Sequence, residues 1–379
     1  MKAVTAVDAV NAGRAAVNVP RAWVELLRLP ALFTVPGDAL AGAAATGLRP
    51  NHRTLLAIGS SLCLYEAGMA LNDWADRAED AVERPERPLP SGRIAPPAAL
   101  TAAAALTAAG LALASRAGRP SLAMAGALAG TVWAYDLGLK HTPAGPAAMA
   151  TARGLDLLLG ATATAGPGHG PRAQAAAPSA AALAAHTLAV TVVSRREAQG
   201  GSSAAPLAAL ATTTALARLI GAGRREGQAR STDGQALRTV AATGRQDSGT
   251  AVATDRMGLR SGVATDRVGL RSAVATDRDG LGTAVATDRE SLRSAVATGR
   301  QALRGVLALA YVGTAAKPLF HAALNPSPPL TQRAVGGGIR AMIPLQAALA
   351  ARAGAAGTAL LTVALAPAAR KFARKVSVT

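Results

Sequence analysis

The run IAPPAALTAAAALTAAGLALAS, residues 94–115, carries no charged side chain and is long enough to cross a membrane as one helix. A membrane-spanning helix needs about 20 largely apolar residues. The stretch between Arg172 and Arg195 is also free of charge. Further apolar stretches are shorter or carry a polar break: 31–48, 54–72, 119–138, 146–163, 203–221, 303–324, 333–351 and 354–368. Together they predict about nine spans and a short tenth hydrophobic segment, which either spans the membrane or lies in its interface.

The composition also favours a membrane protein. Apolar residues make up 50% of the chain, charged residues only 16%, and the mean hydropathy is +0.24, whereas a soluble domain typically has about 25% charged residues. Aromatic residues are only 2%, so the helices present mainly small side chains, which allow membrane helices to approach closely. A soluble alanine-rich helical protein is the alternative, but the charge-free runs lack an amphipathic period. The sequence therefore predicts an all-α, polytopic membrane bundle.

The net charge of +18 raises the possibility of a nucleic-acid partner. The basic residues, however, lie at the ends of apolar runs and in a repeat, not on the aromatic-interleaved patch that single-strand binders need. No nucleic-acid partner is therefore predicted. The lone Cys63 excludes an internal disulfide and a cysteine metal cluster. No signal peptide is expected, since the first 30 residues contain four basic residues and no long apolar core before Leu29.

Basic residues in the short loops indicate how the bundle is oriented, because lysine and arginine favour the cytoplasmic side. They follow the second, fourth and sixth predicted spans and fill the C-terminal tail: Arg77, Arg84, Arg87, Arg93, Lys140, Arg195, Arg196, Arg370, Lys371, Arg374 and Lys375. Alternation of the spans puts all of these residues on one side. The predicted location is the bacterial cytoplasmic membrane, with this side facing the cytoplasm. The bias is imperfect, because Arg49, Arg53, Arg116 and Arg119 fall on the opposite side.

An eleven-residue repeat interrupts the apolar pattern between about residues 231 and 304, with VATDR recurring at its start. Eleven residues nearly equal three helical turns, but Gly258, Gly269 and Gly280 weaken such a helix. We interpret the tract as a low-complexity insertion that is disordered or loosely helical, with a helix on the lipid surface as the alternative. The predicted division is a cytoplasmic segment 1–28, bundle parts 29–222 and 303–369 around the insertion 223–302, and a basic tail 370–379.

The sequence NDWADRAED, residues 72–80, carries the clearest chemistry. Asn72, Asp76 and Asp80 are spaced i, i+4, i+8, so a helix would place three oxygen ligands in a line on one face. Mg²⁺ takes oxygen ligands and commonly joins one or two carboxylates to substrate phosphates. Acidic groups that continue into an apolar span are usually functional.

Arginines follow this acidic run closely, at Arg84, Arg87 and Arg93. Guanidinium groups bind phosphate oxygens in a bidentate manner. Acids for a metal beside arginines for phosphate predict a magnesium–diphosphate site. The alternative is a solvated helix end with intrahelical salt bridges, which accounts for Arg77 and Glu79 but not for the acids within the span.

The string NDWADRAEDAVERPERPLPSGRI, residues 72–94, resembles the first aspartate-rich motif of the UbiA superfamily of intramembrane prenyltransferases. It is most similar to the branch encoded in bacterial ebo clusters. Supporting matches are Tyr135-Asp136 with Leu139-Lys140, RGLDLLLG at 153–160, SRREAQGG at 194–201 and PSPPLTQRAV at 326–335. The resemblance covers roughly residues 20–222 and 303–375, and it excludes the repeat tract.

The resemblance implies a ring of membrane helices around a central cavity, with an isoprenyl diphosphate held by Mg²⁺ at its cytoplasmic mouth. Asn72, Asp76 and Asp80 would be metal ligands, and Arg87 and Lys140 would contact the diphosphate, while the position of Arg84 beside the acidic run makes it a further diphosphate-binding candidate. The implied reaction is ionisation of an allylic diphosphate and capture of the carbocation by a lipophilic or aromatic acceptor, with charge stabilisation by metal and cations. Asp76 and Asp80 are accordingly predicted as catalytic.

The sequence departs from the family at the second acidic motif. Where the family has two aspartates, the loop at 194–201 contains one acid, Glu197, after Arg195 and Arg196. Glu197 is the remaining catalytic candidate here, and Arg195 and Arg196 are predicted to bind diphosphate in place of a second metal. The alternatives are a non-catalytic protein of the same fold that binds or helps export a small metabolite, and transfer of a phosphosugar onto a polyprenyl phosphate. The histidines are scattered without metal-ligand spacing.

Overall fold

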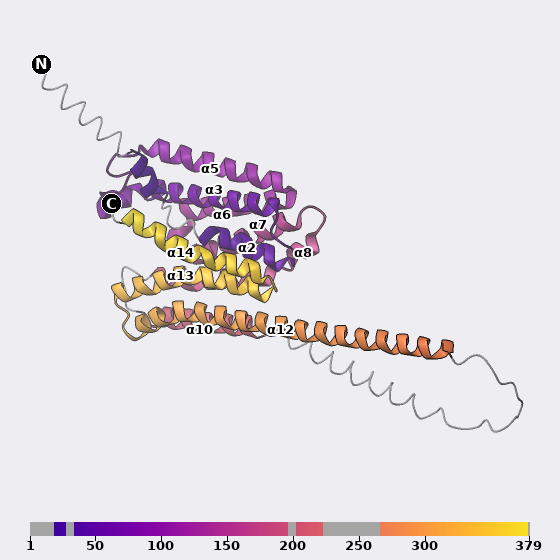
Figure 1. Cartoon of the computed structure of the whole chain (residues 1–379). Helices are drawn as coiled ribbons and strands as arrows, with labels where there is room; N and C mark the ends of the chain where they lie inside the picture. Colours follow the sequence, from indigo (N-terminus) through magenta and orange to yellow (C-terminus); the bar gives the residue numbers. More distant parts are fainter. Residues whose placement is uncertain (1–18, 28–33, 196–201, 223–265, 378–379) are drawn as a thin grey trace, which may run out of the picture. The chain divides into compact units, whose positions relative to one another are not determined.

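The computed structural model describes residues 19–27, 34–195, 202–222 and 266–377 (Figure 1). These residues form helices joined by short loops, with no strand among them, which confirms the all-α prediction. After a short helical segment at 19–26, the helices are α2 Val35–Ala45, α3 His52–Ala75, α4 Arg77–Glu83, α5 Pro96–Ala117, α6 Arg119–Leu137, η2 Leu139–His141, α7 Gly145–Ala165, α8 Gly170–Gln174, α9 Ala177–Ser194, α10 Ala204–Gly221, α12 Asp266–Leu324, α13 Pro328–Arg352 and α14 Ala356–Ser377.

The chain divides into two compact units, residues 1–221 with 303–379 and residues 222–302. The first unit contains the bundle. In the second unit, residues 266–302 are helical and belong to α12. The first part of the repeat tract, up to residue 265, lies outside the described residues.

Prolines and one capping box determine where the bundle helices begin. Helices α5, α6, α7, α9 and α13 each have proline in the first two positions, where a missing N–H costs no hydrogen bond. Helix α3 begins instead after Asn51, whose side chain accepts hydrogen bonds from the backbone N–H groups of Arg53 and Thr54 at 2.9 and 3.3 Å. The Thr54 hydroxyl accepts the Asn51 N–H at 2.9 Å in return. Such reciprocal capping satisfies donors that a helix leaves unpaired.

Small residues bring the bundle helices into close contact. A Cβ atom on Gly42 would overlap the carbonyl oxygen of Leu157, and one on Gly160 would overlap the backbone of Ala39. Helices α2 and α7 therefore pack backbone to backbone, as small residues permit in membranes. On the α3–α5 contact, the Ser60 hydroxyl donates a hydrogen bond of 2.8 Å to the carbonyl of Gly110. The alanine-rich composition is thus used for packing.

Within the described part of the chain, six helices are long and apolar enough to cross a membrane: His52–Ala75, Pro96–Ala117, Gly170–Ser194, Ala204–Gly221, Arg293–Leu324 and Pro328–Arg352. Large apolar side chains on them are exposed; Leu309, for example, is 73% exposed. The predicted span at 31–48 contains only the 11-residue helix α2, about 16 Å long at the usual rise. The number of nine spans stays a prediction.

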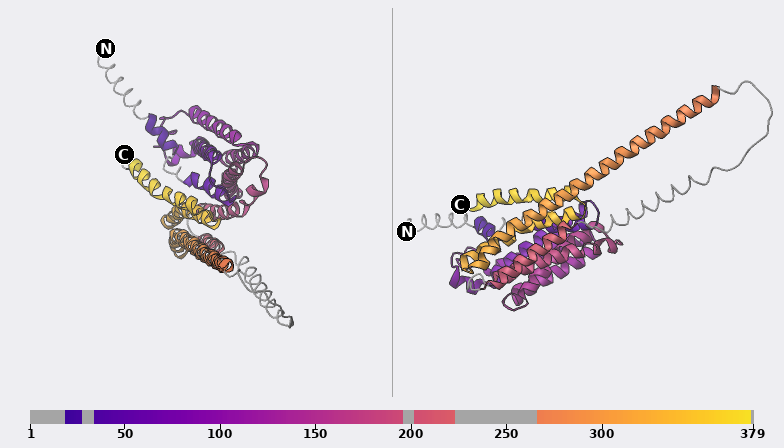
Figure 2. Two further views of the ribbon diagram at one scale, coloured as in Figure 1. Left: turned by 45° about the vertical axis from the view of Figure 1, so that its right-hand side comes forward. Right: turned by 90° about the horizontal axis from the view of Figure 1, so that it is seen from below.

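Helix direction gathers the polar loops at one end of the bundle. Helices α3, α6 and α9 end there, while α5 and α7 begin there (Figures 1 and 2). Two contacts bridge these ends: Lys140 pairs with Asp76, and Arg195 donates a hydrogen bond to the carbonyl of Thr142. We call this end the motif end, because Asp76 and Asp80 lie in it.

We expect the bundle to fold without residues 223–302. Ile220 of α10 and Leu307 of α12 belong to the same apolar core cluster, so a short linker should join residue 222 to residue 303. A chain with this deletion and a Gly/Ser linker should insert into membranes and retain its melting temperature in detergent within a few degrees. The matched control removes residues 204–221, that is, α10, and should prevent folding. Loss of insertion in the first deletion would place the tract in the core.

Candidate active site

A cavity of about 310 Å³ lies between α3, α6 and α7. Its wall is largely apolar and contains two tyrosines and five other polar or charged side chains among the described residues. The lining residues are Ser61, Leu64, Tyr65, Gly68, Met69, Asn72, Leu128, Val132, Tyr135, Asp136, Ala148, Met149, Ala152, Arg153 and Asp156. Asn72, Tyr135 and Asp136 lie toward the motif end. On α3, Ser61 lies eleven residues before Asn72, about 16 Å deeper in the bundle, and Asp156 of α7 accepts a hydrogen bond from Ser61 at this depth.

The first acidic motif spans the junction of α3 and α4. Asp76 is the single residue between the two helices, with φ −85° and ψ 2°. Its N–H still donates to the Asn72 carbonyl at 2.9 Å, and the Asp80 N–H donates to the Asp76 carbonyl at 2.8 Å. The backbone therefore keeps the i, i+4, i+8 relation that the sequence predicted. The three side chains nevertheless have different surroundings.

Asn72 lines the cavity, whereas Asp80 turns to two arginines. Arg87 Nη1 donates to Asp80 Oδ2 at 2.7 Å and lies 3.7 Å from Asp73 Oδ1. Arg84 Nη1 lies 3.5 Å from Asp80 Oδ1. Asp73 and Asp80 are both buried, and Arg87 contributes to neutralising both carboxylates, which are costly to desolvate as uncompensated charges.

Asp76 is bridged to the segment that follows α6. The Lys140 ammonium pairs with Asp76 Oδ1, and only 9% of the Lys140 side chain is exposed. Arg195, at the end of α9, donates to the Thr142 carbonyl two residues after Lys140. Cations from two separate segments, residues 84–87 and Lys140, thus pair with the acids of the first motif, and Arg195 lies against the loop that carries Lys140. Arg196 and Glu197 lie outside the described residues.

Asp76 also belongs to a group of potential metal ligands. One ligand atom from each of Asp76, Glu79 and His141 lies within 4.8 Å of the others. Two carboxylates at this separation suit a cation that takes oxygen ligands, so the residues present fit Mg²⁺. The sequence shows no metal-ligand spacing around His141. This residue comes close to Asp76 and Glu79 only because η2 folds against the α3–α4 junction.

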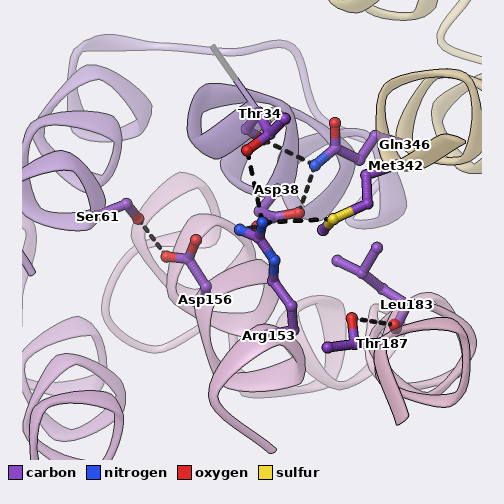
Figure 3. Close-up of polar contacts among 9 residues, drawn as sticks. All are labelled: Thr34, Asp38, Ser61, Arg153, Asp156, Leu183, Thr187, Met342 and Gln346. Atoms are coloured by element: carbon purple, nitrogen blue, oxygen red, sulfur yellow. Dashed lines mark hydrogen bonds and ion pairs between the residues drawn. The ribbon is translucent and has the colours of Figure 1, made fainter. Parts of the chain in front are cut away.

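A second polar network crosses the bundle beside the deep part of the cavity (Figure 3). Arg153 Nη1 donates to Asp38 Oδ2 at 2.6 Å, and Gln346 Nε2 donates to Asp38 Oδ1 at 2.6 Å and to the Thr34 carbonyl at 2.9 Å. Asp38 is completely buried. The network therefore joins α2, α7 and α13 through one carboxylate.

Asp156 extends this network to α3. Its Oδ1 accepts a hydrogen bond from the Ser61 hydroxyl, and both residues line the cavity (Figure 3). Asp156 forms no ion pair with any described residue, although Arg153 lies one turn earlier on the same helix. The deep wall of the cavity therefore presents a carboxyl group and a guanidinium group in apolar surroundings.

Asp38, Asp73 and Gln346 were not singled out from the sequence, and Asp156 entered only within the RGLDLLLG match. Asp38 and Asp156 each interrupt a predicted span, and an ionisable residue inside a span is itself a sign of function or pairing. Gln346 carries no comparable signal. Its role depends on how α13 packs against α2, which sequence spacing does not show.

Comparisons with known proteins agree on one family. Residues 31–220 match the model of the UbiA prenyltransferase family, which confirms the resemblance. The chain is 35% identical over 128 residues to digeranylgeranylglyceryl phosphate synthase of Methanopyrus kandleri, covering 32% of this chain and 45% of that protein. It is 37% identical over 144 residues to the synthase of that name in Methanothrix thermoacetophila, covering 37% and 54%. The chain thus spans about half the length of the curated relatives it matches.

A solved structure of a digeranylgeranylglyceryl phosphate synthase has the same fold. It superposes with a TM-score of 0.50 at 15% identity and covers 89% of this chain and 99% of its own. At this identity the likeness concerns the helical architecture only.

We predict that Arg153→Met lowers the free energy of unfolding by about 3–5 kcal/mol, because it leaves the buried Asp38 carboxylate without its cation. The double variant Asp38→Asn/Arg153→Met should recover much of this loss, since no uncompensated charge remains. Denaturation midpoints in detergent micelles measure both effects. The control is Arg119→Gln, an exposed residue on α6, which should change stability by less than about 0.5 kcal/mol. A double variant no more stable than Arg153→Met alone would contradict the ion-pair explanation.

Proposed function

The chain belongs to the UbiA prenyltransferase family, and we propose that it transfers an isoprenyl group from a diphosphate donor to a lipophilic or aromatic acceptor in the cavity between α3, α6 and α7. One observation carries the proposal. Lys140, Arg84, Arg87 and Arg195 gather with the acids of the first motif at the motif end of a largely apolar cavity. A diphosphate with an apolar tail needs this combination.

The cations bind the diphosphate oxygens. Arg84 and Arg87 offer planar guanidinium groups suited to two-point binding of phosphate, and Lys140, beside Asp76, offers a compact positive charge. Arg195 adds a cation where the family has its second acidic motif. We propose that it takes over part of the charge neutralisation there, together with Arg196, while Glu197 contributes less.

Mg²⁺ is the cofactor that we propose, held by Asp76 and Asp80 with Asn72 as the neutral ligand. The proximity of Glu79 and His141 to Asp76 makes these two side chains further candidates. Bound Mg²⁺ supplies positive charge that stabilises the departing diphosphate. The family as a whole supports this assignment.

The reaction breaks the bond between C1 of the isoprenyl group and the diphosphate oxygen, and both electrons leave with the diphosphate. The apolar lining side chains, among them Leu64, Leu128 and Val132, exclude water that would otherwise capture the allylic cation. Tyr65 and Tyr135 line the same space, and aromatic rings stabilise nearby positive charge. A new bond from the acceptor to C1 completes the transfer.

The acceptor loses one proton when this bond forms, and a carboxylate in the cavity is the natural group to accept it. Asp136 and Asp156 both line the cavity, and neither forms an ion pair with a described residue. Asp136 lies near the motif end, close to the site of bond formation, and is our candidate. The relatives are named for glyceryl phosphate products, which supports a lipophilic acceptor.

Two finer assignments belong to the same proposal. The run RPERPLPSGR at 84–93 supports the branch encoded in bacterial ebo clusters. The arginines and lysines at the motif end support a cytoplasmic orientation in the bacterial cytoplasmic membrane. The competing function is a non-catalytic carrier of the same fold, which the single acid of the 194–201 loop favours.

We expect Asp76→Asn to lower the rate of diphosphate release by at least about a hundred-fold, because charge stabilisation in a site of low polarity is worth that much. The assay uses purified protein, Mg²⁺ and a panel of allylic isoprenyl diphosphates. Glu83→Gln is the matched control, since Glu83 is an exposed acid on α4 whose only ion pair with a described residue is with Arg84 at 4.0 Å, and it should retain activity. Wild-type protein that binds the donor equally well without Mg²⁺ and releases no diphosphate would favour the carrier.

The loop after α9 yields a separate prediction. Arg195→Ala should weaken binding of a non-reactive diphosphate analogue about ten-fold even at saturating Mg²⁺, because the cation acts on phosphate directly. Glu197→Gln should weaken Mg²⁺-dependent binding much less than Asp80→Asn does. Isothermal titration with and without Mg²⁺ measures all three. Equal losses for Glu197→Gln and Asp80→Asn would identify the loop as a full second metal motif.

A further inference from the structure

A second pocket, of about 190 Å³, lies between α12 and α13 on the bundle unit. Its lining residues are Lys317, Pro318, His321, Leu330, Arg333 and Arg340. Lys317, Arg333 and Arg340 are exposed, and none of them forms an ion pair with a described residue. The proposed prenyl transfer does not use this pocket.

The charge in this pocket has no acidic counterpart nearby in the sequence. Residues 303–379 contain nine lysines and arginines and no aspartate or glutamate. Helices α12 and α13 are both among those apolar enough to cross a membrane. Three cations on such helices are unfavourable in hydrocarbon unless an anion accompanies them.

The backbone shapes the pocket to hold these cations together. A Cβ atom on Gly337 would lie 2.9 Å from Pro318 Cγ, so α12 and α13 approach closely at the floor of the pocket. Gly336 leaves space for Arg340, whose Nη1 lies 3.2 Å from the position of such a Cβ atom. The Arg340 side chain therefore extends back toward the start of α13, as a long cation does when it reaches for the membrane surface.

The turn between α12 and α13, residues 325–327, lies at the motif end (Figure 1), and the pocket is lined by residues on both sides of this turn. The contact between α9 and α13 supports this placement, because His186 Nε2 of α9 lies 3.0 Å from the carbonyl oxygen of Gly338 of α13. His186 lies nine residues before Arg195, and Gly338 lies ten residues after Pro328, so the end of α9 and the start of α13 are at the same end of the bundle. Lys317 lies seven residues, or about 10 Å, from the end of α12. Phospholipid phosphates lie at the boundary of the hydrocarbon, where the ends of membrane-spanning helices are found.

We propose that this pocket binds the phosphate of an anionic phospholipid, with Lys317, Arg333 and Arg340 around the phosphate and Leu330 and Pro318 against the first part of an acyl chain. Basic pockets between membrane helices are suited to anionic headgroups. The apolar part of the wall favours a lipid over free phosphate, because only a lipid has an acyl chain to contact Leu330 and Pro318. The bound lipid neutralises charge that the chain itself leaves uncompensated.

The test measures phosphatidylglycerol bound to the full-length chain in neutral detergent, by native mass spectrometry and by the shift in melting temperature. The triple variant Lys317→Gln/Arg333→Gln/Arg340→Gln should lose affinity on the order of a hundred-fold, since each basic residue near an anionic headgroup contributes about 1 kcal/mol. Each single variant should lose about five-fold, which keeps the test informative if the triple variant does not fold. Arg116→Gln, an exposed arginine on α5 outside the pocket, should bind as the wild type does.

Two further ligands identify the source of the phosphate. Phosphatidylcholine should bind wild type and triple variant equally and weakly, and inorganic phosphate in excess should not reproduce the shift in melting temperature. Unchanged phosphatidylglycerol binding in every pocket variant would overturn the proposal. A shift from inorganic phosphate as large as that from phosphatidylglycerol would replace the lipid with a free anion. None of these readouts depends on prenyl transfer, so they stand or fall separately from the proposed activity.

Discussion

The ion pair between Arg153 and Asp38 is the interaction on which the arrangement of the bundle depends. Asp38 is fully buried on α2 and receives hydrogen bonds from α7 and α13. A carboxylate in this position is strongly unfavourable without both partners, so the three helices can pack only in a register that brings Arg153 and Gln346 to it. The same register holds Asp156 against Ser61 of α3. Because α3 and α7 also form the walls of the cavity, the interior polar network sets its shape.

The motif end follows the same electrostatic rule, but with charges that can exchange partners. Asp76 pairs with Lys140, and Asp80 and Asp73 share Arg87. Under the proposed function, the cations would bind a diphosphate and the carboxylates would hold Mg²⁺. Each group then moves from one charged partner to another, and no charge is left unpaired in the low-dielectric surroundings. The partial exposure of Asp76 and Arg87, in contrast to Asp38, fits a site whose pairs must open.

The sequence was sufficient for the helical class, the family and the first motif, because these depend on local information. Charge-free runs mark helices by length alone, and the i, i+4, i+8 spacing survives the junction at Asp76 because two backbone hydrogen bonds cross it. The contacts of Asp80 could not be predicted in this way. The position of Asp80 in the motif suits a metal ligand, yet its carboxylate pairs with Arg87. The loop after α4 brings Arg87 back to the helix that carries Asp80.

The placement of His141 and Gln346 shows why the remaining part of the site required the structure. His141 reaches Asp76 and Glu79 through the short helix η2, and Gln346 reaches Asp38 across more than 300 residues of chain. Neither relation has a sequence period. Both contacts depend on which helices are neighbours in the bundle. In an alanine-rich bundle, a few polar side chains determine which helices are neighbours. With apolar surfaces so uniform, packing alone distinguishes poorly between alternative neighbours, and buried polar pairs supply the difference. The polar residues that interrupt the spans are therefore the residues that specify this fold.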